Sequence, residues 1–424
     1  MNAKDAISYL RHTVQPSLGC TEPACAALCC GATSETGIGE IKSLKLVVNP
    51  GLYKNAMSVA IPGFDEVGMA YAAALGALLK RTDKELQIFE DLTPEIAKAA
   101  KKLVADKKIT VTVDYDQKGL YARCEIEGSS GRAAAEIRGS HTNIVRIIKD
   151  GQIIFEKGII AAAKGDPFEE ELKKSTIEDI VSAVEDMKFS DISFLLEGIP
   201  PNEATAAYGK DHPGPVGIAS TLYDSLGNSL MERMMKKVGT SIEARLGGAL
   251  CTVMSSAGSG SKGLAVILPI SEAAGDMHAS DEKLARALAL GHLVNSYINL
   301  IIGKLSAFCT CAAGASVGAS CGLTYLWGGS AKEIGYAINN MTGAVAGMIC
   351  DGGKTGCGLK LTQATSSAYL SARMAVSGHT LRPTDGICDQ TPEACIAHLA
   401  SLANKGMKDA DKEILDIMLN KKLE

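Results

Sequence analysis

The 424-residue sequence predicts an α+β fold, with a mainly helical C-terminal domain and a smaller domain built of a mainly antiparallel β-sheet plus helices. Strand-like runs separated by Gly or Asp-Gly turns fill residues 109–158. From about residue 175 onward the periodicity is helical, and Ala, Gly and Ser are abundant. The sequence is 46% hydrophobic, which is enough to bury two cores, so we expect two domains.

The elements follow in chain order. Residues 1–35 look helical and are expected to pack on the helical domain. Residues 36–165 are predicted to form the α/β sheet domain, and a charged linker, "KGDPFEEELKKS" at 164–175, then leads into the helical domain of residues 170–424. The predicted strands lie at 41–48, 109–115, 120–128, 131–139, 142–151 and 152–158.

Charge and hydropathy narrow the class of function. The net charge is −5 and the Lys and Arg residues are scattered, which argues against nucleic acid or an anionic membrane as partner and favours a small molecule. The opening "MNAKDAISYL" lacks the apolar core of a signal peptide, so we expect a cytoplasmic protein. The apolar segment 284–303 contains Arg286, His292 and two asparagines, which predicts a buried helix rather than a membrane span. The oligomeric state stays open, with a homo-oligomer as one option.

Thirteen cysteines in a chain without a secretion signal favour metal binding, catalysis or packing over disulfides. The stretch "MICDGGKTGCGLK" at 348–360 places Cys350 at the end of a helical pattern (331–349) and Cys357 just before the next helix. The glycines between them allow the backbone to wrap closely around a ligand. Upstream, "FCTC" adds Cys309 and Cys311. The alternative is that these cysteines are small apolar fillers at a helix crossing.

The spacing of these cysteines does not match the paired motifs of a closed zinc site. Three thiolates, one from Cys309 or Cys311 plus Cys350 and Cys357, fit an iron–sulfur cluster better. Such a cluster would keep one iron without a protein ligand, and that iron would act as a Lewis acid on a substrate heteroatom.

A second candidate is Cys20 in "SLGCTEPACAALCCGA" (17–32). Thr21 is predicted as the N-cap of a helix, which puts Cys20 just outside its positive end. The helix dipole would lower the pKa of this thiol, so we expect a thiolate that removes a proton from carbon.

Three polar loops are candidate substrate-binding segments. "SSAGSGSKG" (255–263) contains a literal G-x-G-x-x-G but no surrounding βαβ unit, so a dinucleotide site is discounted, and its Ser and Gly residues are instead assigned to a carboxylate. The alternatives are a flexible loop here and ordinary turn residues in the other two segments. The candidate residues are Ser255, Ser256, Gly258 and Ser259 in this loop, Ser140, His141 and Thr142 in "RGSHTN", and Lys54 and Asn55 in "NPGLYKNAMSVAIPGF".

Taken together, "GCTEP", "YKNAMSVAIPG", "SSAGSGSKG", "CTCAAGASVGAS" and "NNMTGAVAGMICDGGKTGC" resemble the L-cysteine desulfidase family over almost the whole chain. The C-terminal half is more distantly similar to the alpha chain of iron–sulfur L-serine dehydratases. The resemblance implies a four-iron four-sulfur cluster held by three cysteines, and β-elimination without pyridoxal phosphate. Cys350 and Cys357 match two cluster ligands, Cys311 is preferred over Cys309 as the third, and Cys20 matches the proposed base.

We therefore expect L-cysteine desulfidase activity, in which cysteine yields pyruvate, ammonia and sulfide. L-serine dehydratase is the alternative that uses the same site, because the base and the open iron serve either leaving group. A non-catalytic small-molecule-binding protein with structural cysteines is the second alternative.

Overall fold

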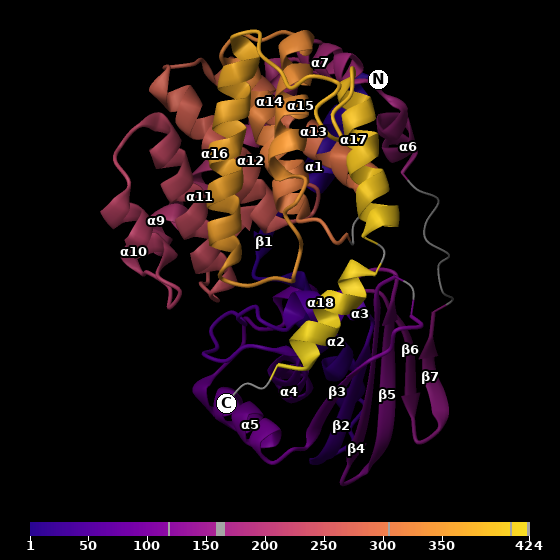
Figure 1. Cartoon of the computed structure of the whole chain (residues 1–424). Coiled ribbons are helices and arrows are strands. Elements are labelled where there is room, and N and C mark those ends of the chain that lie inside the picture. Colours follow the sequence, from indigo (N-terminus) through magenta and orange to yellow (C-terminus); the bar gives the residue numbers. More distant parts are fainter. Residues whose placement is uncertain (118, 158–165, 304–305, 408, 422–424) are drawn as a thin grey trace.

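The computed structural model describes residues 1–117, 119–157, 166–303, 306–407 and 409–421, and every structural statement below refers to these residues. They form a sheet unit and a helical unit, each with its own hydrophobic core (Figure 1). The predicted α+β class is confirmed. The expected linker and the boundary near residue 165 lie partly outside the described residues.

The strands of the sheet unit follow the predicted runs. Their order is β3-β2-β4-β5-β6-β7, and each neighbouring pair is antiparallel except β2 and β3, which run parallel. The prediction of a mainly antiparallel sheet is therefore confirmed. The strands are β2 (Ile41–Val48), β3 (Ile109–Val113), β4 (Tyr121–Gly128), β5 (Gly131–Arg138), β6 (Ile144–Lys149) and β7 (Gln152–Glu156).

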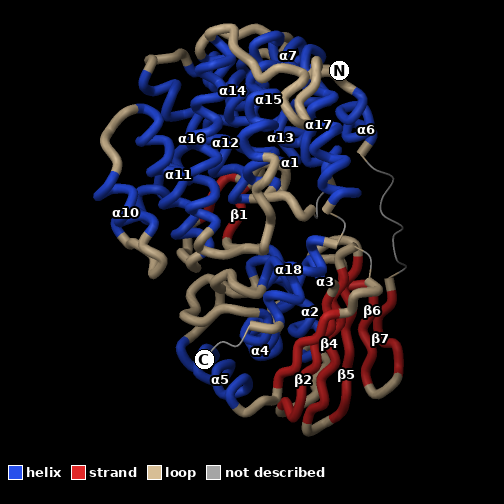
Figure 2. The backbone as a smooth tube through the Cα atoms, viewed as in Figure 1, coloured by secondary structure: helices blue, strands red, loops and turns tan. Residues whose placement is uncertain are grey.

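Helices cover one face of this sheet (Figure 2). α2 packs on β4 and β5, and α4 packs against α2. A Cβ added at Gly76 of α4 would lie 2.1 Å from the carbonyl oxygen of Ala27, so only glycine permits this close crossing. The helices of the unit are α2 (Thr21–Ser34), α3 (Pro50–Ala56), α4 (Met69–Leu79), the 3-10 helix η1 (Thr82–Gln87) and α5 (Pro94–Ala105).

The helical unit is organised around the buried helices α12 (Gly260–Asp276) and α13 (Asp281–Ile302), and α14 (Val317–Leu326) packs against both. Small residues bring the backbones together, as at Gly318, where an added Cβ would lie 2.3 Å from the carbonyl oxygen of Gly291. α13 corresponds to the predicted buried helix, and no described helix is long and apolar enough to cross a membrane.

The remaining elements of the helical unit run on in chain order around this centre (Figure 1). They are α1 (Ala3–Thr13), α6 (Pro167–Lys174), α7 (Ile177–Glu185), α8 (Phe189–Ile192), η2 (Ser193–Gly198), α9 (Ile199–Asp211), α10 (Ile218–Ser225), α11 (Leu230–Leu246), the π-helix η3 (Cys311–Ser316), α15 (Ala331–Val345), α16 (Cys357–Val376), α17 (Pro392–Ser401) and the π-helix η4 (Leu402–Gly406).

Both ends of the chain cross between the two units. α1 packs on the helical unit, whereas α2 belongs to the core of the sheet unit, so the expected packing of residues 1–35 as one segment on the helical domain is wrong for α2. Between them, β1 (Pro16–Leu18) pairs antiparallel with β8 (Thr252–Met254) of the helical unit (Figure 2). At the other end, α18 (Ala410–Leu419) leaves the helical unit and lies on α3. These crossings place Cys20, which follows β1, at the junction of the units.

Candidate active site

The glycine-rich loop between α15 and α16 lies against α3 of the sheet unit. Gly352 has a φ of +91°, and a Cβ added there would lie 2.1 Å from the carbonyl oxygen of Lys54. Ser58 and Lys354 form an isolated parallel bridge that extends this contact. The glycine at position 352 is thus explained by a left-handed backbone and by close approach to α3, and the loop brings its two flanking cysteines to the junction.

A short antiparallel contact holds the two cysteine segments together. The amide of Cys309 donates to the carbonyl of Met348 at 2.9 Å, and the amide of Cys350 donates to the carbonyl of Ala307 at 2.7 Å. Because side chains alternate along extended segments, Cys309 and Cys350 lie on the same side of this contact. Cys350 lies beyond the end of α15, in the loop, and Cys357 is the first residue of α16 rather than the residue before it.

The four cysteines of this region influence one another's pKa. The pKa of Cys309 is lowered to about 6, chiefly because the Cys311 thiol donates to it, with burial acting in the opposite direction. Burial raises the pKa of Cys357 to about 11, and that of Cys350 is also raised by burial. The charge of Cys309 acts on both Cys350 and Cys357. The structure therefore brings together the cysteines that the sequence singled out.

Lysines surround this group. Lys54 is only 4% exposed, and its ammonium donates to the carbonyl of Cys350 at 3.1 Å and to Asp411 of α18 at 2.6 Å. Lys354 and Lys360 both pair with Asp351 inside the loop, and Lys360 also donates to the carbonyl of Ile349 at 2.9 Å. These positive charges lower the pKa of the neighbouring thiols and would stabilise an anionic group between them.

The cysteine group suits one kind of metal centre and not another. Among the described residues, no three Cys, His, Asp or Glu side chains converge closely enough to hold a single metal ion. An iron–sulfur cluster is several atoms across, so its thiolates stand farther apart than the ligands of one ion, and thiolates are its usual ligands. Three mutually interacting thiols within a lysine-lined junction thus fit a cluster and do not fit a lone ion.

Cys20 differs from its prediction in two respects. It is itself the N-cap residue of α2, which begins at Thr21, and its thiol donates to the Glu22 carboxylate at 2.9 Å. Burial and the negative charge of Glu22 raise the pKa of Cys20, although Arg245 acts in the opposite direction. The expected free thiolate is therefore wrong: desolvation and the adjacent carboxylate outweigh the helix dipole.

The carboxylate of Glu22 interacts with candidate residues from three separate sequence segments. Its carboxylate accepts hydrogen bonds from Thr21 at 3.0 Å and from the side-chain amide of Asn55 at 3.2 Å. Burial raises the pKa of Glu22, whereas the charge of His141 and the hydrogen bond from Cys20 lower it. The lowering effects together outweigh burial, so the net shift of the pKa is downward. Of the predicted hairpin trio, His141 thus acts on the site, whereas Ser140 is exposed and Thr142 only half-buried.

The Ser255–Ser259 loop uses its hydroxyls internally. Ser255 accepts the amide proton of Gln15 at 3.0 Å and donates to the carbonyl of Thr13 at 3.2 Å. Gly258 is exposed with a φ of +72°, and Ser259 is the N-cap residue of α12. The hydroxyl of Ser255 therefore holds α1 and β1 in place, which leaves it unsuited to the predicted role in carboxylate binding.

Ser256 begins a buried polar chain inside the helical unit. Its hydroxyl contacts His292 Nδ1 and Asn295 Nδ2, each at 2.8 Å. Asn299 Nδ2 donates to Asn295 Oδ1 at 2.7 Å, and Lys262 Nζ donates to Asn299 Oδ1 at 2.5 Å. The pKa of Cys311 is raised by its hydrogen bond to Cys309 and by burial, and the charge of Lys262 acts in the opposite direction. This series of polar contacts therefore ends at the cysteine group.

Sequence reasoning missed three of these side chains, namely Glu22, Lys262 and Arg245. Arg245 lies at the end of α11 and donates to Ser261 Oγ at 3.0 Å and to the carbonyl of Gly19. Its charge acts on both Cys20 and Cys311. The signal available in the sequence was weak: "GCTEP" contains Glu22 and "SSAGSGSKG" contains Lys262, but Arg245 lies in no quoted motif.

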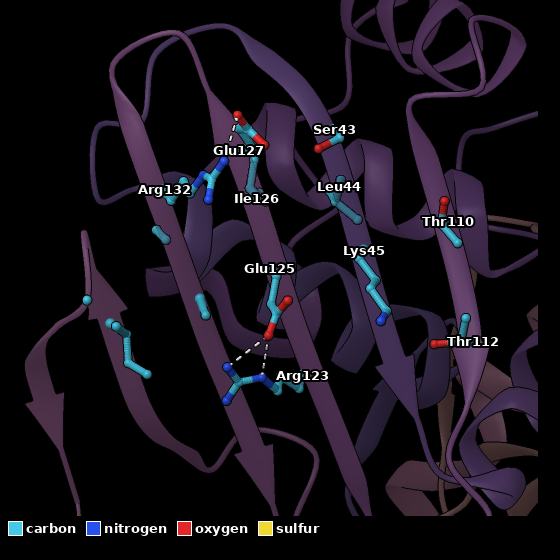
Figure 3. Close-up of a pocket in the computed structure, with 14 residues that line it drawn as sticks. Ser43, Leu44, Lys45, Thr110, Thr112, Arg123, Glu125, Ile126, Glu127 and Arg132 are labelled. Carbon is cyan, nitrogen blue, oxygen red and sulfur yellow. Dashed lines mark hydrogen bonds and ion pairs between the residues drawn. The ribbon is translucent and has the colours of Figure 1, made fainter.

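A hollow with a volume of about 740 Å³ lies elsewhere, on the outer face of the sheet (Figure 3). Its charged side chains pair with each other, Arg123 with Glu125 at 2.9 Å and Arg132 with Glu127 at 3.2 Å. No predicted site residue lines it. It is the polar, solvated face of an antiparallel sheet. A second hollow, of about 20 Å³ and only large enough for a water molecule, lies beside Cys20.

Comparison with known proteins places this chain in a family. The family model described as "Serine dehydratase alpha chain" matches residues 83–416. A UPF0597 protein of Alkaliphilus oremlandii is 35% identical over 418 residues, covering 97% of both chains. A UPF0597 protein of Clostridioides difficile is 36% identical over 420 residues, covering 97% of this chain and 98% of the relative. The chain therefore belongs to the serine dehydratase alpha chain family, together with the UPF0597 proteins.

Proposed function

We propose that this protein is an iron–sulfur-dependent lyase that converts L-cysteine to pyruvate, ammonia and sulfide. The observation that supports it best is that the charge of one buried arginine, Arg245, interacts with Cys20 and Glu22 as well as with Cys311. β-Elimination requires a proton acceptor and an electrophile around one small substrate, and this junction holds candidates for both.

Cys350 and Cys357 would hold the cluster, with Cys309 as the third ligand in preference to Cys311. Cys309 lies on the same side of the antiparallel contact as Cys350, and its charge acts on both other ligands. Cys311 also interacts with Cys309 and Cys357, but in addition it is influenced by Lys262 and acts on Arg245. When bound, the cluster supplies a Lewis-acidic iron that assists departure of the β-substituent.

The chain's own residues would carry the proton transfers. The Cys20 thiol proton passes to the Glu22 carboxylate, and the sulfur so freed takes the α proton of the substrate. The Cα–H electron pair forms the Cα–Cβ double bond as the Cβ–S bond breaks and sulfide leaves. Asn55 and His141 hold Glu22 in place and stabilise its charge. The product, aminoacrylate, hydrolyses to pyruvate and ammonia without further catalysis.

L-Serine dehydration is the second candidate, because the matching family model is that of a serine dehydratase alpha chain. The proton acceptor is the same for both amino acids, and only the leaving group differs. A non-catalytic binding protein is the remaining alternative.

Purification and reconstitution without oxygen, followed by iron and sulfide analysis, test the proposal. We expect a brown protein that releases sulfide and pyruvate from L-cysteine faster than it releases pyruvate from L-serine. Faster turnover of serine would make it a serine dehydratase. A colourless protein that turns over neither amino acid would leave only the binding role.

A further inference from the structure

Arg245 is a buried cation without a carboxylate partner in the described structure. It is 6% exposed, and its guanidinium donates only to neutral oxygens: Ser261 Oγ, Ser17 Oγ at 3.5 Å and the carbonyl of Gly19. Its Nε has no hydrogen-bond partner. The charge of Glu22 acts on it, but among the described residues the guanidinium forms no ion pair with a carboxylate. Since burying a charge is costly unless it is paired, this arrangement is incomplete without an anion.

The N-terminus of α12 lies directly against this guanidinium. A Cβ added at Gly260 would lie 2.7 Å from Arg245 Nε, so the missing side chain is what allows the contact. α12 begins without a side-chain cap, and Ser259, its N-cap residue, leaves the first amides of the helix to other acceptors. A helix N-terminus carries partial positive charge and binds carboxylates well.

From these two observations we infer that Arg245 and the first turn of α12 form the subsite for the α-carboxylate of the amino-acid substrate. This inference rests on the proposed function and gives it a binding geometry. The carboxylate is common to cysteine and serine, so the same subsite would serve either substrate. It would also orient the β-substituent, because the charge of Arg245 interacts with both Cys20 and Cys311.

The subsite replaces the serine hydroxyls predicted from the sequence. The hydroxyls of Ser255 and Ser256 already serve the fold, whereas the guanidinium and the helix N-terminus have unused hydrogen-bonding capacity. Arginine suits this role because its planar fork can donate two parallel hydrogen bonds to one carboxylate.

The test measures equilibrium binding of L-alanine and L-alaninamide to anaerobically prepared protein. L-Alanine has the carboxylate but no leaving group, and the amide lacks the negative charge. We expect wild-type protein to prefer L-alanine, and R245Q to bind it about 10- to 100-fold more weakly, while amide binding stays unchanged. R245K should retain part of the preference, because lysine keeps the charge without the fork.

The matched control is R286Q. Arg286 is also largely buried and donates to main-chain carbonyls, of Val184 and Glu185, but it lies away from the junction on α13. It should leave alanine binding unchanged. If R245Q does not fold, the test relies on R245K. If either variant prefers L-alanine over L-alaninamide as strongly as the wild type does, the proposed subsite is wrong.

The outcomes also separate the subsite from the lyase proposal. Turnover of cysteine with an unchanged KM in R245Q would overturn the subsite and leave the lyase intact. Arginine-dependent binding of L-alanine by a protein that turns over neither amino acid would uphold the subsite and overturn the lyase.

Discussion

The protein contains two groups of four cysteines in contrasting surroundings. The core cysteines, Cys25, Cys29, Cys30 and Cys124, are fully buried in the sheet unit. The junction cysteines are Cys309, Cys311, Cys350 and Cys357, and three of these four are half-buried between the units.

The two groups differ in the charged side chains that surround them. Burial raises the pKa of Cys25, Cys29 and Cys30, and the charged groups that act most strongly on them are carboxylates and other thiols rather than lysine or arginine. Lys54, Lys262, Lys354 and Lys360 act on the junction cysteines and favour their ionised forms. A thiolate ligand is tolerated only where positive charge compensates for the lost water. The number of cysteines in a group therefore does not by itself indicate a metal site.

The strongest test of this contrast compares C357S with C124S. We expect C357S to lose the iron and to lower the rate of sulfide release at least about 100-fold, because one of three cluster ligands is removed. C124S should keep its iron and its rate. Both are measured by iron analysis and sulfide assay under anaerobic conditions. Equal iron content in the two variants would show that the junction is not a cluster site.

A second comparison is between two carboxylates. E22Q should lower kcat by about 100-fold or more with its iron unchanged, because Cys20 loses its proton acceptor. The control, E136Q, removes the buried carboxylate that pairs with Arg123 and Arg138 in the sheet, and it should leave kcat unchanged. A normal kcat in E22Q would remove Glu22 from the mechanism.

The variants C309S and C311S identify which of these two cysteines is the third cluster ligand. If Cys309 is the third ligand, C309S should lose most of its iron, whereas C311S should retain it and show a smaller loss of rate, of about ten-fold. Iron content per chain is the measurement. Loss of iron in C311S alone would restore the preference drawn from the sequence.

The smallest expected effect concerns packing in the core group. C29A should lower the free energy of unfolding by about 1 kcal/mol, because the Cys29 thiol fills the core and donates to the carbonyls of Ala122 and Ala135. Its iron content should match the wild type. Denaturant titration measures the stability, and a change in iron would contradict a purely structural role for this group.

The fold was largely predictable because each element leaves a local pattern. Alternating apolar residues and Gly or Asp-Gly turns located the strands after residue 108, and the buried helix α13 followed from a long apolar segment that is interrupted by polar and charged residues. The packing of α2 on the sheet was not predictable, because an Ala- and Cys-rich helix that is buried on nearly every side has no amphipathic face to show its partner.

The sequence by itself determined the fold class, the family and the presence of Cys20 and the four junction cysteines, since these depend on short local motifs. The tertiary structure decided what surrounds them. Glu22 and Lys54 reach the junction from α2 and α3 near the start of the chain, whereas Arg245 comes from α11, far away in the sequence. Whether a thiol is protonated, and whether a cation has a partner, depends on burial and on charges brought together by folding, and no local motif encodes those.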